Sequence, residues 1–270
     1  MLYVATVHYR SPRWTKIQTE HMHRHLPVPH EIWTSLEHID PSYGVHFDRV
    51  LDQHGSHAGK LNHLAMEISQ VASPDDLLMF IDGDAFLIAD PMPAIREGLQ
   101  KAPLIAVRRA ENFNEPQPHP CFCVTTVRTW NALQGDWTSG YTWPGVTGRQ
   151  GGDVGGNLLR RLELSGTPWV ELLRTNRVNL DPLYYAVYGG IVYHHGAGFR
   201  TGELSLTDRE ASPKPLPRSR LPLVGQLLRL ANRRRWRAWE VRTQRRHLKQ
   251  SERIFESIER GDPEWLAQLV

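Results

Sequence analysis

Two carboxylates, Asp82 and Asp84, stand one residue apart at the end of an apolar run. The run, residues 77–81, has polar residues on both sides, which is typical of a strand buried on both faces. In an open α/β sheet, ligands bind outside the carboxyl ends of the strands. Gly83 lets the backbone turn sharply between the two carboxylates. Because like charges this close repel each other, the pair predicts a divalent cation shared with a phosphate-bearing ligand.

Asp153 is the next carboxylate whose surroundings indicate chemistry. It lies in the glycine-rich stretch 147–156, just before a predicted helix. One interpretation is an N-cap of that helix, a position for which Asp is well suited. The other is a carboxylate that points into a cleft, where glycines let the backbone approach a substrate. Both interpretations stay open at the level of the sequence.

Two adjacent histidines, His194 and His195, end a predicted strand and are followed by Gly196 and Arg200. An imidazole added to carboxylates suits Mn²⁺. Since side chains alternate along a strand, we expect only one of the two histidines to point into the site. The alternative is a pair of surface histidines at a strand end.

Lys60 follows a loop of small residues, 54–59, at the start of a predicted helix. Backbone N–H groups at a helix start, together with an ammonium group, form a suitable site for an anion. The alternative is that Lys60 is a solvated helix residue. The loop lacks the spacing of a Walker motif, so it does not indicate a nucleoside triphosphate site.

The elements that must position these residues follow an α/β pattern. Apolar runs predict strands at residues 2–8, 31–36, 77–81, 104–107 and 122–127. Periodic apolar residues predict helices at 11–25, from Lys60 to 71, and at 129–133. The opening strand, helix and strand favour a Rossmann-like half. We therefore expect a mixed sheet flanked by helices, followed by a C-terminal helical appendage.

Residues 77–91, with an apolar strand before the two aspartates and an apolar continuation after them, resemble a known motif. It is the Asp-x-Asp motif of nucleotide-sugar-dependent glycosyltransferases of the GT-A fold. The resemblance covers about residues 1–205 in motif order and spacing. It implies a GT-A sheet, a Mn²⁺ or Mg²⁺ cofactor and a nucleotide-sugar donor, with a UDP-sugar favoured. The implied reaction moves a sugar to the hydroxyl of a glycan or a lipid-linked acceptor, in cell-surface glycan or glycolipid synthesis.

The resemblance also implies roles for individual residues. Asp84, with either His194 or His195, would hold the metal, and Asp82 would contact the metal or the ribose and sugar. Asp153 would be the catalytic residue, a base that removes the acceptor proton if the enzyme inverts. The residues implied to bind the nucleotide sugar are Val7, Tyr9, Arg10, Lys60, Asp82, Gly83, Asp84, Gly196 and Arg200.

Two functions of other classes compete with this interpretation. A phosphatase of the haloacid dehalogenase type also presents Asp-x-Asp after an apolar strand, but at its first strand, whereas a full βαβ unit precedes Asp82 here. A non-catalytic binding module that kept the fold is the second alternative. His119, Cys121 and Cys123 also admit a zinc site, but no fourth ligand is evident nearby, and buried thiols on a strand are the commoner outcome.

Composition is that of a soluble globular chain: of 270 residues, 40% are hydrophobic and 23% are charged. No window approaches the roughly 18 apolar residues of a membrane span, and the N-terminus shows no secretory signal. The only cysteines, Cys121 and Cys123, are two apart on a predicted strand, where we expect them to face the same way without bridging. Reduced thiols favour a cytoplasmic protein.

Charge divides the chain into a mildly acidic body and a basic tail. Residues 1–211 hold 18 basic and 23 acidic residues, and residues 212–270 hold 14 basic and 6 acidic residues. The Pro-rich stretch 212–217 is a plausible linker, so we expect a catalytic domain at 1–211 and a helical tail at 212–270.

The tail combines leucines, tryptophans and many arginines. Leu223, Leu227 and Leu230 share a helical face, and arginines surround Trp236 and Trp239. This composition is typical of a helix at an anionic membrane surface, which would place the protein at the inner face of the membrane and suit a lipid-linked acceptor. The alternative is a helix whose arginines pair with the acidic body. Nucleic acid is the least favoured partner.

Overall fold

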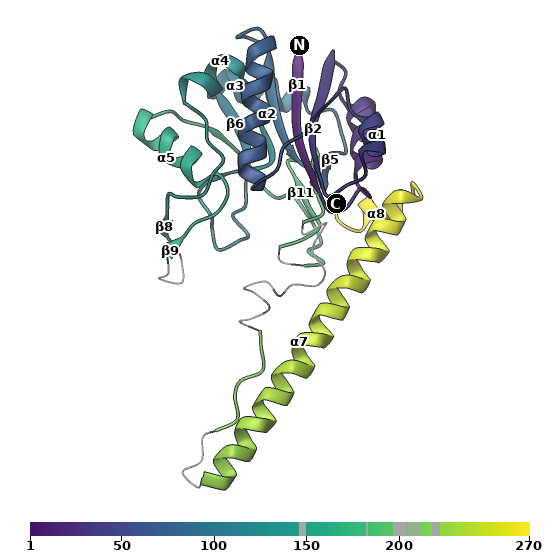
Figure 1. Ribbon diagram of the computed structural model, residues 1–270, viewed down its shortest axis with the longest axis vertical. Helices are drawn as coiled ribbons and strands as arrows, with labels where there is room; N and C mark the ends of the chain where they lie inside the picture. The colour runs from purple at the N-terminus through teal and green to yellow at the C-terminus, as the bar shows by residue number, and fades with distance from the viewer. Residues whose placement is uncertain (146–149, 182, 197–203, 205–207, 209–210, 218–221) are drawn as a thin grey trace. The chain divides into compact units, whose positions relative to one another are not determined.

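The computed structural model describes residues 1–145, 150–181, 183–196, 204, 208, 211–217 and 222–270 (Figure 1). The chain divides into two compact units, Met1–Phe199 with Gln268–Val270, and Arg200–Ala267. The predicted boundary between residues 211 and 212 therefore falls inside the second unit.

A seven-stranded sheet forms the centre of the first unit, in the order β10-β6-β7-β4-β1-β2-β3. Its strands are β1 (Leu2–Tyr9), β2 (His30–Glu37), β3 (Arg49–Leu51), β4 (Leu77–Asp82), β6 (Leu104–Arg108), β7 (Pro118–Thr126) and β10 (Val170–Leu172). The strand β4 pairs parallel with β1 and antiparallel with β7. The mixed sheet expected from the sequence is therefore confirmed, and the strand that carries Asp82 lies at its centre.

Helices cover both faces of this sheet (Figure 1). Ala5 and Phe80 face one side, where they pack with Leu64 of α2 (His57–Val71). Val4 and Met79 face the other, where they pack with Met22 of α1. The helices α4 (Val127–Ala132) and α5 (Gly156–Ser165) also pack on the first face. The helices α1 (Thr15–His25) and α3 (Met92–Lys101) pack on the second face. This second face is also covered by a smaller antiparallel sheet of β11 (Ala186–Tyr188), β12 (Val192–His194) and β5 (Ala85–Leu87). The shorter elements are η1 (Pro41–His46), β8 (Trp143–Pro144) and β9 (Gln150–Gly151).

A bulge in β7 changes the direction of its first side chains. Ala106 pairs with Cys123, but the next residue of β6, Val107, pairs with His119. Pro120 falls in the skipped segment, where its missing N–H removes no ladder hydrogen bond. The expectation that the two cysteines face the same way is wrong, because Cys121 packs with α1 and α3 and Cys123 packs on the α2 side. Both thiols are free and buried.

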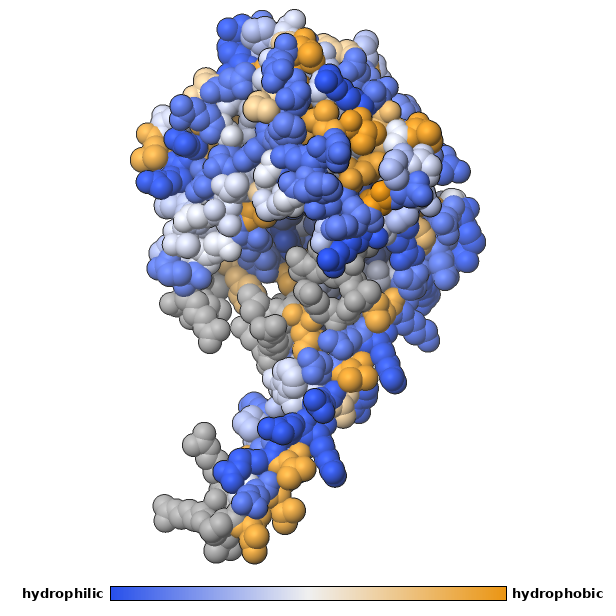
Figure 2. All heavy atoms as spheres, in the orientation of Figure 1, coloured by the Kyte–Doolittle hydropathy of each residue, from blue (hydrophilic) through white to orange (hydrophobic). Residues whose placement is uncertain are grey.

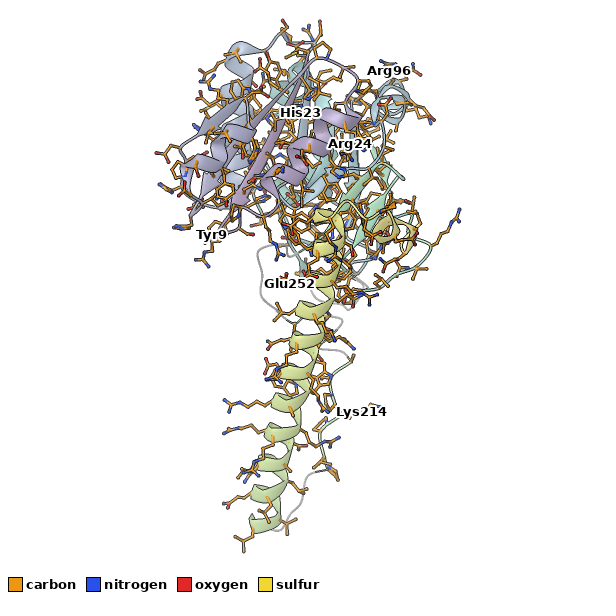
Figure 3. All side chains as sticks on the ribbon, turned by 90° about the vertical axis from the view of Figure 1, so that its right-hand side faces the viewer. Tyr9, His23, Arg24, Arg96, Lys214 and Glu252 are labelled. Carbon is orange, nitrogen blue, oxygen red and sulfur yellow. The ribbon has the colours of Figure 1, made fainter. Side chains whose placement is uncertain are left out.

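The second unit contains α7 (Pro222–Glu259) and α8 (Glu264–Ala267). The Pro-rich stretch lies against α7, since the Leu216 N–H donates to Asn232 Oδ1 over 2.7 Å. Apolar side chains lie exposed among hydrophilic ones along α7 (Figure 2), and side chains project from it on several sides (Figure 3). Leu223 and Leu227 are 76% and 69% exposed. None of the helices in the described ranges is long and apolar enough to cross a membrane.

The last residues of the chain belong to the first unit again. The carbonyl oxygen of Leu269 accepts the N–H groups of Arg177 over 2.8 Å and of Val178 over 3.4 Å, and the Leu269 side chain is fully buried. The chain therefore leaves the first unit after Phe199 and re-enters it at Gln268.

Candidate functional site

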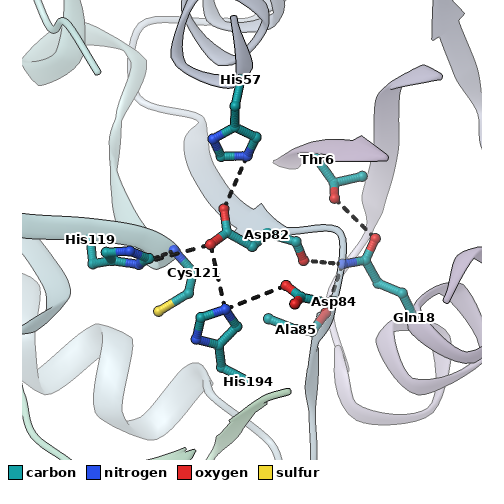
Figure 4. A network of polar contacts seen from close by, with 9 residues as sticks. All are labelled: Thr6, Gln18, His57, Asp82, Asp84, Ala85, His119, Cys121 and His194. Atoms are coloured by element: carbon teal, nitrogen blue, oxygen red, sulfur yellow. Dashed lines mark hydrogen bonds and ion pairs between the residues drawn. The ribbon is translucent and has the colours of Figure 1, made fainter. Parts of the chain in front are cut away.

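Asp82, Asp84 and His194 meet where β4 ends and β5 begins (Figure 4). In the small sheet, β12 places His194 opposite Ala85, the residue that follows Asp84. The imidazole Nε2 of His194 lies 3.4 Å from Asp84 Oδ1 and 3.7 Å from Asp82 Oδ2. The ligand atoms of these three residues all lie within 4.8 Å of one another. The predicted carboxylates and one of the two predicted histidines are thus brought together.

Two histidines that were not predicted to lie beside Asp82 complete its surroundings (Figure 4). His57, the first residue of α2, has its Nε2 3.2 Å from Asp82 Oδ1. His119, turned by the bulge in β7, has its Nδ1 3.8 Å from Asp82 Oδ2 and accepts the Cys121 N–H there. Burial raises the pKa of Asp82, but the hydrogen bond and the charge of His57 act against it, and the net pKa lies below its ordinary value.

His119 is held neutral by its surroundings. Burial, and then the positive charge of Arg109, lower its pKa well below the ordinary value. Because Nδ1 accepts the Cys121 N–H, the single ring proton sits on Nε2. The earlier alternative of a His119, Cys121 and Cys123 zinc site does not fit, since the two thiols pack on opposite faces of the sheet.

The turn between Asp82 and Ala85 is fixed by Gln18, a fully buried residue of α1 (Figure 4). Its Nε2 donates to the carbonyl oxygens of Asp82 and Ala85, both over 2.7 Å. Its Oε1 accepts from Thr6 Oγ1 and meets His8 Nε2, both at 3.0 Å. Since Oε1 can only accept, His8 must carry its proton on Nε2. Burial lowers the pKa of His8 to about 4, which keeps the ring neutral.

Gly83 is required by the close approach of β1. A Cβ at this position would lie 2.4 Å from the Val7 carbonyl oxygen and 2.9 Å from His8 Nδ1. Real side chains do not tolerate the shorter distance, so only glycine fits between the two aspartates. The predicted residues Val7 and Gly83 are therefore in direct backbone contact.

His195 lies on the other side of β12 from His194. Its Nδ1 is 2.9 Å from the Tyr193 hydroxyl, and its ring packs against Trp14 and Tyr185. Its backbone N–H donates to the Asp84 carbonyl oxygen over 3.0 Å. The histidine that alternation directs into the site is thus His194. Gly196 follows with a left-handed φ of 71°, and Arg200 lies outside the described residues.

Tyr9, Arg10 and Lys60 gather at the end of β1, together with Glu37, a residue that sequence reasoning missed. Arg10 Cζ and Lys60 Nζ lie 4.8 and 5.1 Å from the centre of the Tyr9 ring. Figure 3 shows Tyr9 at the edge of the first unit. Lys60 is 2% exposed and its ammonium pairs with the Glu37 carboxylate. The alternative of a solvated Lys60 is therefore wrong, and its charge is already balanced within the protein.

Asp153 precedes α5 but does not cap it, because the N-cap position is Gly155. Its Oδ1 accepts the Val154 N–H over 2.8 Å. Gly155 has a left-handed φ of 89°, and a Cβ there would lie 2.2 Å from the Pro118 carbonyl oxygen. Asp153 is not among the groups around Asp82. Its charge acts on Glu115, whose pKa is raised to about 7, first by burial and then by Asp153, against the lowering effect of Arg109.

No protein-family model matches the sequence, and no curated protein matches it. Solved structures similar to this chain include the mannosyltransferase PcManGT from Pyrobaculum calidifontis in complex with GDP-Man and Mn²⁺, with 13% identity and a TM-score of 0.38 over 51% of this chain and 47% of that one. They include the glycosyltransferase GlyE of Streptococcus pneumoniae TIGR4, with 12% identity and a TM-score of 0.37 over 49% and 36%. The galactosyltransferase LgtC, in complex with donor and acceptor sugar analogs, has 7% identity and a TM-score of 0.34 over 48% and 60%. This chain spans between about a third and 60% of the length of these structures. Glycosyltransferases are thus among the known structures that this chain resembles over about half its length.

Proposed function

We propose that this chain is a metal-dependent glycosyltransferase, which moves a sugar from a nucleotide-sugar donor to an acceptor hydroxyl. A UDP-sugar is the favoured donor. The observation that carries the proposal is the group of Asp82, Asp84 and His194 at the end of the central strand β4, with ligand atoms within 4.8 Å of one another. Ligand sites of open α/β sheets lie at this end of the strands.

The residues present fit a divalent cation. Two carboxylates and one imidazole form a donor set that suits Mn²⁺ and also admits Mg²⁺. Asp82 Oδ1 is buried and makes no hydrogen bond of good geometry within the described residues, although His57 lies 3.2 Å away as an ion-pair partner. The other oxygen, Asp82 Oδ2, faces His194 Nε2 at 3.7 Å. A bound cation would neutralise the departing diphosphate.

Other side chains of the protein are proposed to position the aspartates, to act as the base and to bind the nucleotide. Gln18 holds the backbone of the turn, so that Asp82 and Asp84 keep their separation. Asp153 is proposed as the acceptor-side base, where it would take the proton of the attacking hydroxyl. The nucleotide is proposed to lie along Val7, Tyr9 and Arg10 at the end of β1. Lys60, Gly196 and Arg200 are proposed to assist the diphosphate, with Lys60 acting from its pair with Glu37.

The first test is thermal unfolding with UDP and GDP, each with and without Mn²⁺. A ligand at about 100 times its Kd stabilises the folded protein by about 2.7 kcal/mol. We expect a rise that needs both metal and one nucleotide, and we expect Asp84→Asn to abolish it without lowering the unfolding temperature of the free protein. Asp75→Asn, at an exposed surface pair with Arg128, is the control. A shift that survives Asp84→Asn would refute the metal site, and no shift with either nucleotide would favour the binding module.

A second part of the proposal concerns the acceptor and its place in the cell. The exposed Leu223, Leu227 and Leu230 beside arginines support binding of α7 to an anionic membrane, on the cytoplasmic side, and hence a lipid-linked or other glycan acceptor. We expect Leu227→Asp to weaken sedimentation with phosphatidylglycerol vesicles, with little effect on phosphatidylcholine. Leu164→Asp, a change at a 73% exposed leucine of the first unit, is the control. Equal vesicle binding by both variants would contradict the membrane role.

A further inference from the structure

The loop between β6 and β7 places three polar side chains in the interior with unsatisfied atoms. These atoms are Arg109 Nε, Glu115 Oε2, and both Nε2 and Oε1 of Gln117. Each is buried and has no hydrogen-bond partner of good geometry in the part of the chain that the structure describes, although the Gln117 side chain lies close enough to the Glu115 carboxyl to lower its pKa by hydrogen bonding. Gln117 is only 1% exposed. Buried polar atoms in proteins are nearly always bonded, so a cluster of unsatisfied ones calls for an explanation.

A loosely held loop is not the explanation, because the loop is well anchored. The Arg108 guanidinium donates to the Glu115 carbonyl oxygen over 3.0 Å and to Asn114 Oδ1 over 2.7 Å. It also forms an ion pair of 2.9 Å with Glu171. Asn112 Nδ2 donates to Glu115 Oε1 over 2.6 Å. The loop therefore holds Glu115 in place, with Oε2 buried beside the Gln117 side chain and without a hydrogen bond of good geometry.

The cluster lies between the Asp82 site and Asp153. Gln117 precedes His119, whose ring reaches Asp82. On the other side, a Cβ on Gly155 would lie 3.4 Å from Gln117 Cγ, so the loop that carries Asp153 packs directly on Gln117. Asp153 and Arg109 also both act electrostatically on Glu115. The cluster is therefore next in sequence to His119 and packs against the loop that carries Asp153.

We propose that Arg109, Glu115 and Gln117 form a subsite for a pair of neighbouring sugar hydroxyls, a role that rests on the proposed transferase function. The unsatisfied atoms comprise donors on Arg109 and Gln117 and acceptors on Glu115 and Gln117. A hydroxyl both donates and accepts, so two hydroxyls satisfy the set. One guanidinium beside one carboxylate favours a neutral ligand over an anion or a cation. The hydroxyls belong to the donor sugar or to the acceptor.

Gln117→Leu is the variant that tests this subsite. The Gln117 side chain forms a hydrogen bond that lowers the pKa of Glu115, so replacing the amide with an apolar group of similar size should lower the unfolding temperature of the free protein by no more than about a few °C. Binding of the sugar should weaken about 10- to 100-fold, which is the usual effect of losing hydrogen bonds in a buried site. Glu115→Gln should also weaken it. Glu111→Gln is the matched control, since Glu111 Oε1 already has the Tyr188 hydroxyl as its partner at 2.6 Å.

Two arms distinguish the source of the hydroxyls. The donor arm compares the affinity of UDP-glucose, UDP-galactose and UDP-N-acetylglucosamine with that of UDP, all with Mn²⁺. The acceptor arm follows the methyl glycosides of the same sugars by saturation-transfer NMR, with UDP and Mn²⁺ present. A loss in either arm, with UDP affinity unchanged, supports the subsite and identifies the sugar. Loss in neither arm, or a loss of stability and UDP affinity together, overturns it.

Failure of the proposed function would be recognised separately. If the unaltered protein binds neither UDP nor GDP with Mn²⁺, the transferase proposal fails, and the methyl glycosides without nucleotide become the test. Glycoside binding that Gln117→Leu removes would keep the subsite without the transferase. Absence of glycoside binding to the unaltered protein would overturn the subsite as well.

Discussion

Gln18 is expected to decide whether the Asp82 turn keeps its shape, and Gln18→Leu tests this. The side chain is fully buried and connects α1, β1 and the turn through four hydrogen bonds. Leucine has a similar size but replaces none of these bonds. The carbonyl oxygens of Asp82 and Ala85 then lose the donor that holds them together, and Thr6 and His8 lose their common acceptor.

The size of the effect follows from the number of bonds. A buried hydrogen bond between neutral groups contributes a net of about 1 kcal/mol, so the four bonds together contribute about 4 kcal/mol. In a unit of this length, each kcal/mol corresponds to about 2–4 °C in Tm, which gives a decrease of roughly 10 °C. Gln18→Glu keeps the acceptor for Thr6 but turns a second oxygen toward the two carbonyl oxygens.

Burial raises the pKa of a carboxyl at this position in the folded protein. The stability of Gln18→Glu, relative to the unaltered protein, should therefore decrease as pH rises. It should be greatest below about pH 4.3, where the carboxyl is protonated in the unfolded chain as well. The assay is thermal unfolding with and without Mn²⁺ and UDP, between pH 5 and 8. Gln70→Leu, at an exposed position of α2, is the control and should change Tm little. A Gln18→Leu protein that unfolds within about 2 °C of the unaltered one, with its metal-dependent shift intact, would refute this account.

Two further variants test charged and titrating groups inside the first unit. His8 has its pKa lowered by burial to about 4, so its protonation costs the folded state about 3 kcal/mol as pH falls from about 6.5 to 4. His8→Gln should reduce this acid-dependent loss of stability, measured by urea unfolding across that pH range, and the same change at exposed His23 should not. Lys60→Met leaves the buried Glu37 carboxylate without its lysine partner. It should therefore lower Tm far more than Lys101→Met, which removes an exposed helical pair. Equal decreases in Tm would contradict a structural role for the buried ammonium.

Much of the sheet could be predicted because the local pattern of apolar and polar residues indicates which strands are buried. The apolar run before Asp82 has no polar residue to place toward water, so it had to be a strand covered on both faces. The aspartates at its end follow directly from that strand. The bulge in β7 could not be predicted, because it depends on how His119 and Val107 pair across strands. The expected direction of Cys121 was wrong for the same reason.

Site residues from distant elements were harder to predict. His57 lies on α2 and His119 on β7, and neither has a local pattern that directs it to Asp82. Gln18 offered one usable signal: it lies four residues from both Trp14 and Met22, two apolar residues on the same face of the predicted helix. A polar side chain on such a face must find buried partners. Those partners, however, belong to strands whose positions only the tertiary structure defines.

The return of the chain at Gln268 makes residues 200–267 an insertion into the first unit, not an extension of it. An affinity tag or fluorescent label fused after Val270 would therefore be attached to the unit that contains Asp82, and would report on it instead of on α7. For the same reason, a stop codon after residue 211 would delete the fully buried Leu269 along with the basic helix. A protein that lacks only the helix has to be made by excising an internal segment and keeping the last three residues.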